Sequence, residues 1–224
     1  NATDVIGCVD AVIIPTDKGE EHLERARPFV EAGLPVFIDK PLTICEDDLA
    51  QFVAWHEIGK QIHSSSAMRY AQELIELRAR VAEVGELRSI VVTCAKSWER
   101  YGIHALEAIY GLLPRGGWQD ICNTGSASAN VVHIRHNLPA DVVMIVNADM
   151  FGGFCHVTLY GTKGRLEARF RDSFSAFKAQ LQAFVNFVRG NSDSIRLEDS
   201  IEQCKIIIAG IRSRENNGIR LSVS

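Results

Sequence analysis

Short apolar strands alternate with amphipathic helices over the first third of the chain, and this alternation constrains the fold more than any other feature. The expected strands cover residues 9–14, 36–38 and 61–65, and the expected helices cover residues 20–32 and 43–59. Thr43 and Glu46 have the spacing of a capping box, which predicts that the second helix begins there. Strands and helices that alternate over short connections predict a parallel sheet with right-handed crossovers, as in doubly wound α/β proteins.

The strand that opens at Val36 ends on three residues of special interest. Its sequence, VFIDKPL, is an unbroken apolar run that stops at Asp39, Lys40 and Pro41. An unbroken apolar run suits a strand that is buried on both faces. The carboxyl end of such a strand is where open α/β sheets bind ligands, so Asp39 and Lys40 are candidate site residues. A solvated strand end that a proline terminates explains the same residues and stays open as an alternative.

After about Tyr70 the pattern changes to an α+β arrangement. Further strands are expected at 87–95, 131–135, 142–148, 156–160 and 219–223, with helices at 70–83 and 104–113. The hairpin-length links between successive strands predict an open, mainly antiparallel sheet. Two later helices carry apolar stripes that we expect to be buried, and these are Phe174, Phe177, Leu181, Phe184 and Val188 in the first and Ile201, Cys204, Ile208 and Ile211 in the second. The chain therefore divides into a domain at 1–68 and a domain at 69–224.

Composition excludes several classes of function. The 224 residues are 46% hydrophobic and carry a formal net charge of −4, so there is no basic field for nucleic acid. No apolar run approaches the roughly 18 residues of a membrane span, and no signal-peptide pattern opens the sequence. The six cysteines are widely spaced without a CxxC pair, which favours reduced thiols over a metal site or disulfides. We expect a cytoplasmic protein that binds neither nucleic acid, membrane nor metal.

Several motifs in order resemble one enzyme family. VDAVII is followed by His22 near a helix start, then by EAGLPVFIDKPL, and then by a strand that ends near Arg69. YGIH at residues 101–104 and the GTKG turn at residues 161–164 come later. Together they resemble the Gfo/Idh/MocA oxidoreductases, to which glucose-fructose oxidoreductase and inositol 2-dehydrogenase belong. The resemblance implies the second half of a Rossmann-type nucleotide domain, followed by a substrate and oligomerisation domain.

The resemblance also implies an activity and a set of site residues. Members of the family use NAD or NADP to transfer a hydride at a secondary alcohol or carbonyl of a sugar, an inositol or a related polyol. Lys40 and His104 take the family's catalytic positions, and Tyr101 joins them as a substrate contact. The residues implied on the cofactor side are Pro15, Thr16, Asp17, His22, Asp39, Lys40, Pro41 and Arg69. Histidine suits this chemistry because its ordinary pKa lies nearest neutral pH.

Two departures from the family pattern keep other functions open. Arg100 stands four residues before His104, where the family usually has an aspartate. The sequence also contains no GxGxxG, the motif whose glycines and helix N-terminus hold a pyrophosphate. We expect that motif to lie upstream of Asn1, and we expect this chain alone to bind a dinucleotide poorly. A cofactor-free binding or assembly module, and a lyase or epimerase with transient NAD redox, remain as alternatives.

The antiparallel strands also predict self-association. ANVVHI, DVVMIV and CHVTLY carry apolar residues at both alternating sets of positions. Helices on one side of such a sheet leave the other face without cover, and a large exposed apolar face is rare on a monomer. We therefore expect a homodimer or homotetramer that is joined through this sheet.

Overall fold

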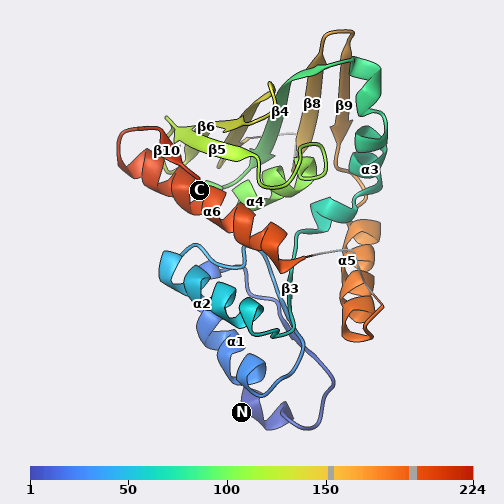
Figure 1. Cartoon of the computed structure of the whole chain (residues 1–224), viewed down its shortest axis with the longest axis vertical. Coiled ribbons are helices and arrows are strands. Elements are labelled where there is room, and N and C mark those ends of the chain that lie inside the picture. The colour runs from blue at the N-terminus through green and yellow to red at the C-terminus, as the bar shows by residue number, and fades with distance from the viewer. Residues whose placement is uncertain (151–153, 192–195, 224) are drawn as a thin grey trace.

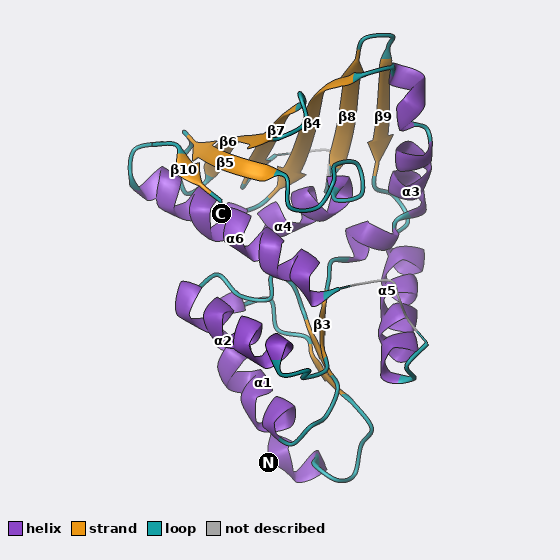
Figure 2. Cartoon of the chain, viewed as in Figure 1, coloured by secondary structure: helices purple, strands orange, loops and turns teal. Residues whose placement is uncertain are grey.

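The molecule contains two β-sheets, one parallel and one mainly antiparallel. A computed structural model of the chain describes residues 1–150, 154–191 and 196–223. Helices and strands follow one another as Figures 1 and 2 show. The strands are β1 (Val12–Ile14), β2 (Val36–Ile38), β3 (Ile62–Ser64), β4 (Leu87–Ala95), β5 (Trp118–Asn123), β6 (Ala129–His136), β7 (Asp141–Asn147), β8 (His156–Gly161), β9 (Arg165–Arg169) and β10 (Leu221–Ser222). The α-helices are α1 (His22–Glu31), α2 (Glu46–Glu57), α3 (Gln72–Ala79), α4 (Trp98–Ile109), α5 (Ser173–Val188) and α6 (Leu197–Glu215).

The first sheet is parallel, as the alternating pattern predicts. Its order is β1-β2-β3, and Val36 pairs with Val12 on one side and with Ile62 on the other. All three residues of β2 are buried, which confirms the doubly covered strand that VFI predicts. Helices α1 and α2 lie together on one side of this sheet in Figure 1. This part of the fold is a parallel α/β unit whose three strands end at one edge.

The expected capping box at Thr43 is wrong. Helix α2 begins at Glu46, and its N-cap residue is Cys45, which makes no side-chain cap. The Thr43 hydroxyl instead accepts a hydrogen bond from the Cys45 backbone N–H at 3.1 Å. A threonine that bonds two residues ahead forms a local turn, and this turn delays the start of the helix.

The second sheet is mixed and mainly antiparallel. Its strand order is β10-β5-β6-β7-β4-β8-β9. Strand β4 lies between β7 and β8, parallel to β7 and antiparallel to β8. The mainly antiparallel sheet is therefore confirmed, but the expectation that successive strands are neighbours fails at β7 and β8, because β4 lies between them. Strands β5 and β9 were not expected from the sequence.

Helix α6 belongs to both halves of the molecule. Leu197, Ile201, Cys204 and Ile208 pack in the core of the parallel sheet. Ile206 and Ile207 pack in the core of the larger sheet. Figure 1 shows α6 between the two halves. The carboxyl-terminal helix thereby fixes how the two sheets face each other, and a division into residues 1–68 and 69–224 crosses one of the two cores.

The apolar stripe of α5 is only partly buried, contrary to expectation. Phe184 is 4% exposed, but Phe174 and Phe177 are 78% and 51% exposed. The buried half of the helix packs by Phe184 against Phe37 and His63 of the parallel sheet. The amphipathic pattern therefore identified the helix correctly, but it could not show how much of the apolar face has a partner.

Helix α4 begins six residues before the expected position, and this difference sets the geometry of the site. Trp98 is the first helical residue, and its indole Nε1 donates to the Ile207 carbonyl oxygen at 3.0 Å. A Cβ on Gly210 would lie 2.6 Å from that indole nitrogen, so the crossing of α4 and α6 depends on glycine there. His104 therefore lies in the middle of a helix that is anchored against α6. No helix in the described part of the chain is both long and apolar enough to cross a membrane.

Candidate functional site

Lys40 lies at the carboxyl end of β2, where the sequence predicts it. Its side chain is buried, and its residue is 8% exposed. The peptide bond between Lys40 and Pro41 is cis. The ammonium Nζ lies 5.1 Å from the centre of the Tyr101 ring, which belongs to α4. A buried lysine from the parallel sheet thus meets an aromatic residue of the second domain.

His104 lies one turn further along α4 and is 5% exposed. Its ring centre lies 5.0 Å from that of Tyr101 and 4.8 Å from that of Phe154. Its Nδ1 lies 2.6 Å from the hydroxyl oxygen of Ser66. Burial, with the nearby charges of Lys40 and Lys96, holds the pKa of His104 well below its ordinary value. The imidazole is therefore neutral at neutral pH and can accept a proton.

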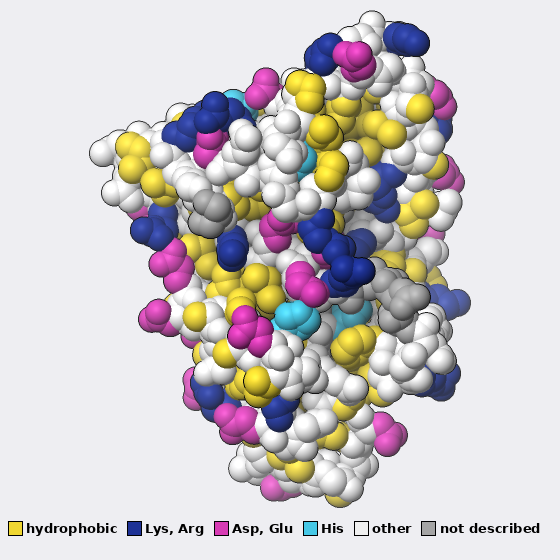
Figure 3. All heavy atoms as spheres, in the orientation of Figure 1, with side chains coloured by type: hydrophobic (Ala, Val, Ile, Leu, Met, Phe, Trp, Pro, Cys, Tyr) yellow, Lys and Arg dark blue, Asp and Glu magenta, His cyan; other side chains and the backbone are white. Residues whose placement is uncertain are grey.

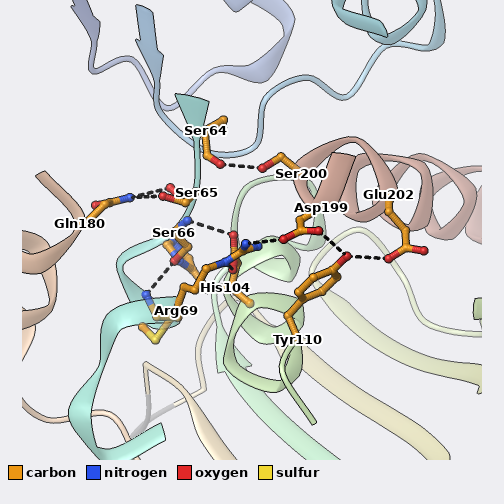
Figure 4. Close-up of polar contacts among 12 residues, drawn as sticks. Ser64, Ser65, Ser66, Arg69, His104, Tyr110, Gln180, Asp199, Ser200 and Glu202 are labelled. Carbon is orange, nitrogen blue, oxygen red and sulfur yellow. Dashed lines mark hydrogen bonds and ion pairs between the residues drawn. The ribbon is translucent and has the colours of Figure 1, made fainter. Parts of the chain in front are cut away.

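A network of buried polar residues surrounds Ser66 and His104. Glu107, one turn after His104, accepts a hydrogen bond from the Ser66 backbone N–H at 3.2 Å. The same carboxylate pairs with Arg69 at 2.5 Å, and Arg69 pairs with Asp199 of α6 at 3.0 Å. Figure 4 shows Tyr110 joining Asp199 to Glu202 at the far end of this network. Within this network, the hydrogen bond from the Ser66 N–H to Glu107 links the end of the parallel sheet to helix α4.

Arg69 therefore lies within that network. Its side chain is 14% exposed, and its guanidinium lies 5.0 Å from the centre of the Tyr110 ring. Its guanidinium pairs with Glu107 and Asp199, although the sequence suggests a cofactor contact. Its role at a cofactor stays a prediction.

Tyr101 stands between two lysines. The Nζ of Lys96 donates to the Tyr101 hydroxyl at 2.6 Å and lies 4.4 Å from the centre of its ring. Arg100, the residue that replaces the expected aspartate, pairs with Asp17 of the loop after β1 at 3.4 Å. On the face drawn in Figure 3, basic, acidic and histidine side chains gather at the level where the two domains meet.

His22 connects the loops at the ends of β1 and β2. Its residue is fully buried. Its Nε2 lies 2.7 Å from the Thr16 carbonyl oxygen, and its Nδ1 lies 2.9 Å from the Pro41 carbonyl oxygen. Both ring nitrogens thus face backbone oxygens, so His22 supports the loops that carry Thr16, Lys40 and Pro41.

The structure allows a test of whether these residues fit a nicotinamide dinucleotide. The Thr16 hydroxyl oxygen is buried and has no hydrogen-bond partner among the described residues. Pro15 and Thr16 also line a groove of about 870 Å³ beside the open edge of β1. Burial raises the pKa of Asp39, and the neighbouring Lys40 charge opposes that rise. These residues suit the nicotinamide end, and the sequence contains no GxGxxG motif for the pyrophosphate.

A second groove lies away from the predicted site residues. A groove of about 420 Å³ between α2, α6 and β10 contains none of the predicted site residues. Within residues 1–150, 154–191 and 196–223, no three His, Cys, Asp or Glu side chains are grouped as metal ligands would be.

The fold thus brings Lys40, Tyr101 and His104 together. His22 contacts the backbone of the neighbouring loops, and Arg69 pairs with the buried carboxylates of Glu107 and Asp199. Sequence reasoning missed Lys96, Ser66 and Glu107. Ser66 and Lys96 each follow the end of a strand, and that position was a usable signal. Glu107 carried no signal beyond being a charged residue on the same helix face as His104.

Comparison with known proteins adds a match at the level of fold. No family model and no curated protein sequence matches the chain. Among solved structures, GenD2 from gentamicin A biosynthesis, in complex with NAD, superposes with a TM-score of 0.86 at 18% identity, over 99% of this chain and 81% of that one. Myo-inositol 2-dehydrogenase from Lactobacillus plantarum has a TM-score of 0.84 at 16% identity, over 100% of this chain and 84% of that one. A myo-inositol dehydrogenase from Corynebacterium glutamicum has a TM-score of 0.80 at 16% identity, over 96% and 80%. At these identities the match establishes a shared fold.

Proposed function

We propose that this chain is an oxidoreductase of the Gfo/Idh/MocA type, which interconverts a secondary alcohol and a carbonyl on a sugar, an inositol or a related polyol. The observation that carries the proposal is the meeting of Lys40 and His104 around Tyr101. Lys40 Nζ lies 5.1 Å from the Tyr101 ring centre, and the His104 ring centre lies 5.0 Å from it. The shared fold with dehydrogenases supports the same conclusion.

His104 acts as the base in the oxidation direction. The ring is neutral because burial and two ammonium groups disfavour its charged form. When Nδ1 donates to the Ser66 hydroxyl oxygen, the lone pair remains on Nε2, which can accept the proton of a substrate hydroxyl. In the reverse direction the same nitrogen returns the proton.

Lys40 stabilises the oxygen that loses or gains this proton. An ammonium that donates to a developing alkoxide lowers the barrier most effectively where water is excluded. Lys40 is buried at the end of β2, immediately before Pro41. His22 holds that loop in place through the Pro41 carbonyl.

The cofactor would be NAD or NADP. Thr16, Pro15 and the backbone around Pro41 would hold its nicotinamide end, beside the groove at the edge of β1. Nicotinamide, when bound, supplies the group that accepts or returns a hydride at the carbinol carbon. The absence of a GxGxxG motif predicts weak binding of the dinucleotide by this chain alone.

A cofactor-free binding module is the second candidate. Arg100 replaces a carboxylate and pairs with Asp17, one of the predicted cofactor contacts. That ion pair favours a chain that has lost the need for a dinucleotide. A lyase or epimerase with transient redox would use Lys40 and His104 without net formation of reduced nicotinamide.

The proposal also covers self-association and the cellular compartment. The outer face of the larger sheet carries half-exposed residues, with Val131 at 45% and Tyr160 at 42%. We propose a homodimer or homotetramer joined through this face. All six cysteines are free thiols, which supports a reducing, cytoplasmic compartment.

An assay of the intact protein with myo-inositol and D-glucose, each with NAD and with NADP, tests the proposal. Formation of reduced nicotinamide that depends on substrate supports the oxidoreductase. Exchange of the carbinol hydrogen with deuterated solvent, without net reduced nicotinamide, would instead identify the epimerase or lyase. No turnover and no dinucleotide binding by the intact protein would favour the binding module.

A further inference from the structure

The site holds one more cation than the proposed reaction uses. Lys40 is next to Asp39, where burial raises the pKa of the carboxyl and the Lys40 charge opposes that rise. Arg100 pairs with Asp17 at 3.4 Å. Lys96 is exposed and its ammonium contacts the Tyr101 side chain, and no carboxylate lies within ion-pair distance of it in the described ranges 1–150, 154–191 and 196–223. Lys96 therefore brings a positive charge that the described site does not balance.

The position of Lys96 is set by the backbone. It follows the end of β4 and has a φ of 75°, in the left-handed region that few residues other than glycine adopt. Its N–H donates to the Asn147 carbonyl oxygen at 2.8 Å. An unfavourable φ that persists at a site is a reason to look for a functional role. This conformation directs the ammonium to Tyr101, whose ring lies beside His104.

Lys96 and Tyr101 together form a pair of hydrogen-bond donors. The ammonium donates to the Tyr101 hydroxyl oxygen at 2.6 Å, so the hydrogen of that hydroxyl is available for another acceptor. The ammonium has two further hydrogens. A group with two acceptor oxygens and one negative charge matches this pair, because hydrogen bonds between charged partners are about twice as strong as neutral ones.

We propose that the substrate carries a carboxylate, and that Lys96 and Tyr101 bind it while Lys40 and His104 act on a neighbouring hydroxyl. This inference rests on the proposed oxidoreductase function and narrows its substrate to the polyhydroxy acids, such as aldonates and uronates. A neutral polyol leaves the Lys96 charge without a counterion. A phosphate monoester carries close to two negative charges, whereas the site leaves one cation to balance.

Titration calorimetry with D-gluconate and D-sorbitol tests the proposal, since the two differ by the carboxylate on the same carbon skeleton. The protein should bind gluconate roughly tenfold more tightly, and added salt should reduce the difference. Lys96→Met should bring the two dissociation constants together, and Lys96→Arg should restore the preference. Lys163→Met, a matched change in the exposed GTKG turn, should keep the preference of the unmodified protein. Equal binding of both compounds, a preference that survives Lys96→Met, or tighter binding of D-glucose 6-phosphate than of gluconate would each overturn the proposal.

The binding test and the turnover test distinguish failure of the carboxylate site from failure of the oxidoreductase function. Preferential binding of gluconate without any reduced nicotinamide would refute the oxidoreductase and leave the carboxylate site standing. Oxidation of neutral polyols without a gluconate preference would refute the carboxylate site and leave the oxidoreductase standing.

Discussion

His104 Nδ1 and Ser66 Oγ lie 2.6 Å apart, and the two residues come from opposite sides of the junction between the domains. Ser66 follows β3 of the parallel sheet, whereas His104 belongs to α4. A hydroxyl rather than a carboxylate contacts this imidazole, and Arg100, four residues before His104, pairs with Asp17. The neutral state of His104 then depends on burial and on the two nearby lysines.

Replacing Ser66 with alanine should reduce turnover more than substrate affinity. The substitution frees His104 Nδ1, so we expect kcat to fall by roughly 10- to 100-fold with KM little changed. Ser200→Ala is the matched control, because Ser200 is also buried and donates to the Ser64 carbonyl oxygen without touching His104. Equal losses of kcat in both variants would count against an orienting role for Ser66.

Replacing Glu107 with glutamine should destabilise the fold. Glu107 is 1% exposed and pairs with Arg69, so neutralising it weakens a buried pair and should cost about 3 kcal/mol of unfolding free energy. Urea unfolding measures this directly. Glu83→Gln, which removes an exposed pair with Arg80, should leave the midpoint unchanged. A Glu107 variant as stable as the unmodified protein would contradict the structural role of the network.

His63 should make stability depend on pH. Burial lowers its pKa from 6.5 to about 4, and its ring packs against Phe37 and Phe187. Between these pH values the unfolded chain binds a proton that the folded chain excludes, so the free energy of unfolding rises with pH across that window. His63→Phe should reduce the slope by up to about 1.4 kcal/mol per pH unit, with a remainder from His104. His156→Phe, at an exposed site, should leave the slope as it is, and an unchanged slope in His63→Phe would refute the assignment.

A polar substitution on the outer sheet face should separate the protomers. Val131 is 45% exposed and pairs in register with Ile145 of β7. Light scattering should report an oligomer for the unmodified protein at micromolar concentration and a smaller species for Val131→Asp. Ile58→Asp, at a position that is 70% exposed in the other domain, should leave the mass unchanged. A monomer before any substitution would remove the basis for this interface.

The sequence predicted the elements better than their neighbours in space. The unbroken VFI run identified a buried parallel strand because burial on both faces leaves that pattern in the residues themselves. The insertion of β4 between β7 and β8 left no such pattern, since strand order depends on contacts far apart along the chain. Burial of a helix face also depends on distant parts of the chain. Phe174 therefore fits the apolar stripe of its helix and is nevertheless exposed.

The site residues also fall into those that the sequence identified and those that it did not. Lys40 and His104 could be found because a strand end and a familiar motif marked them. Ser66 and Glu107 could not be assigned roles, because these depend on contacts between the end of the parallel sheet and helix α4. Lys96 follows a strand end, but its contact with Tyr101 depends on how the chain turns into α4. Arg69 stood near a strand end as a cofactor residue would, and only the structure reveals its buried carboxylate partners.

The rate of hydride transfer in Lys40→Met tests the central claim most directly. Lys40 ends a strand and contributes little to the core, so the intact variant should unfold at nearly the same temperature as the unmodified protein. Its turnover should be lower by roughly a hundredfold or more, the scale of a lost hydrogen bond to the reacting oxygen. Lys163→Met should change neither quantity. Full turnover in Lys40→Met, with only a small shift in stability, would show that Asp39, Lys40 and Pro41 merely end a strand and would contradict the catalytic assignment.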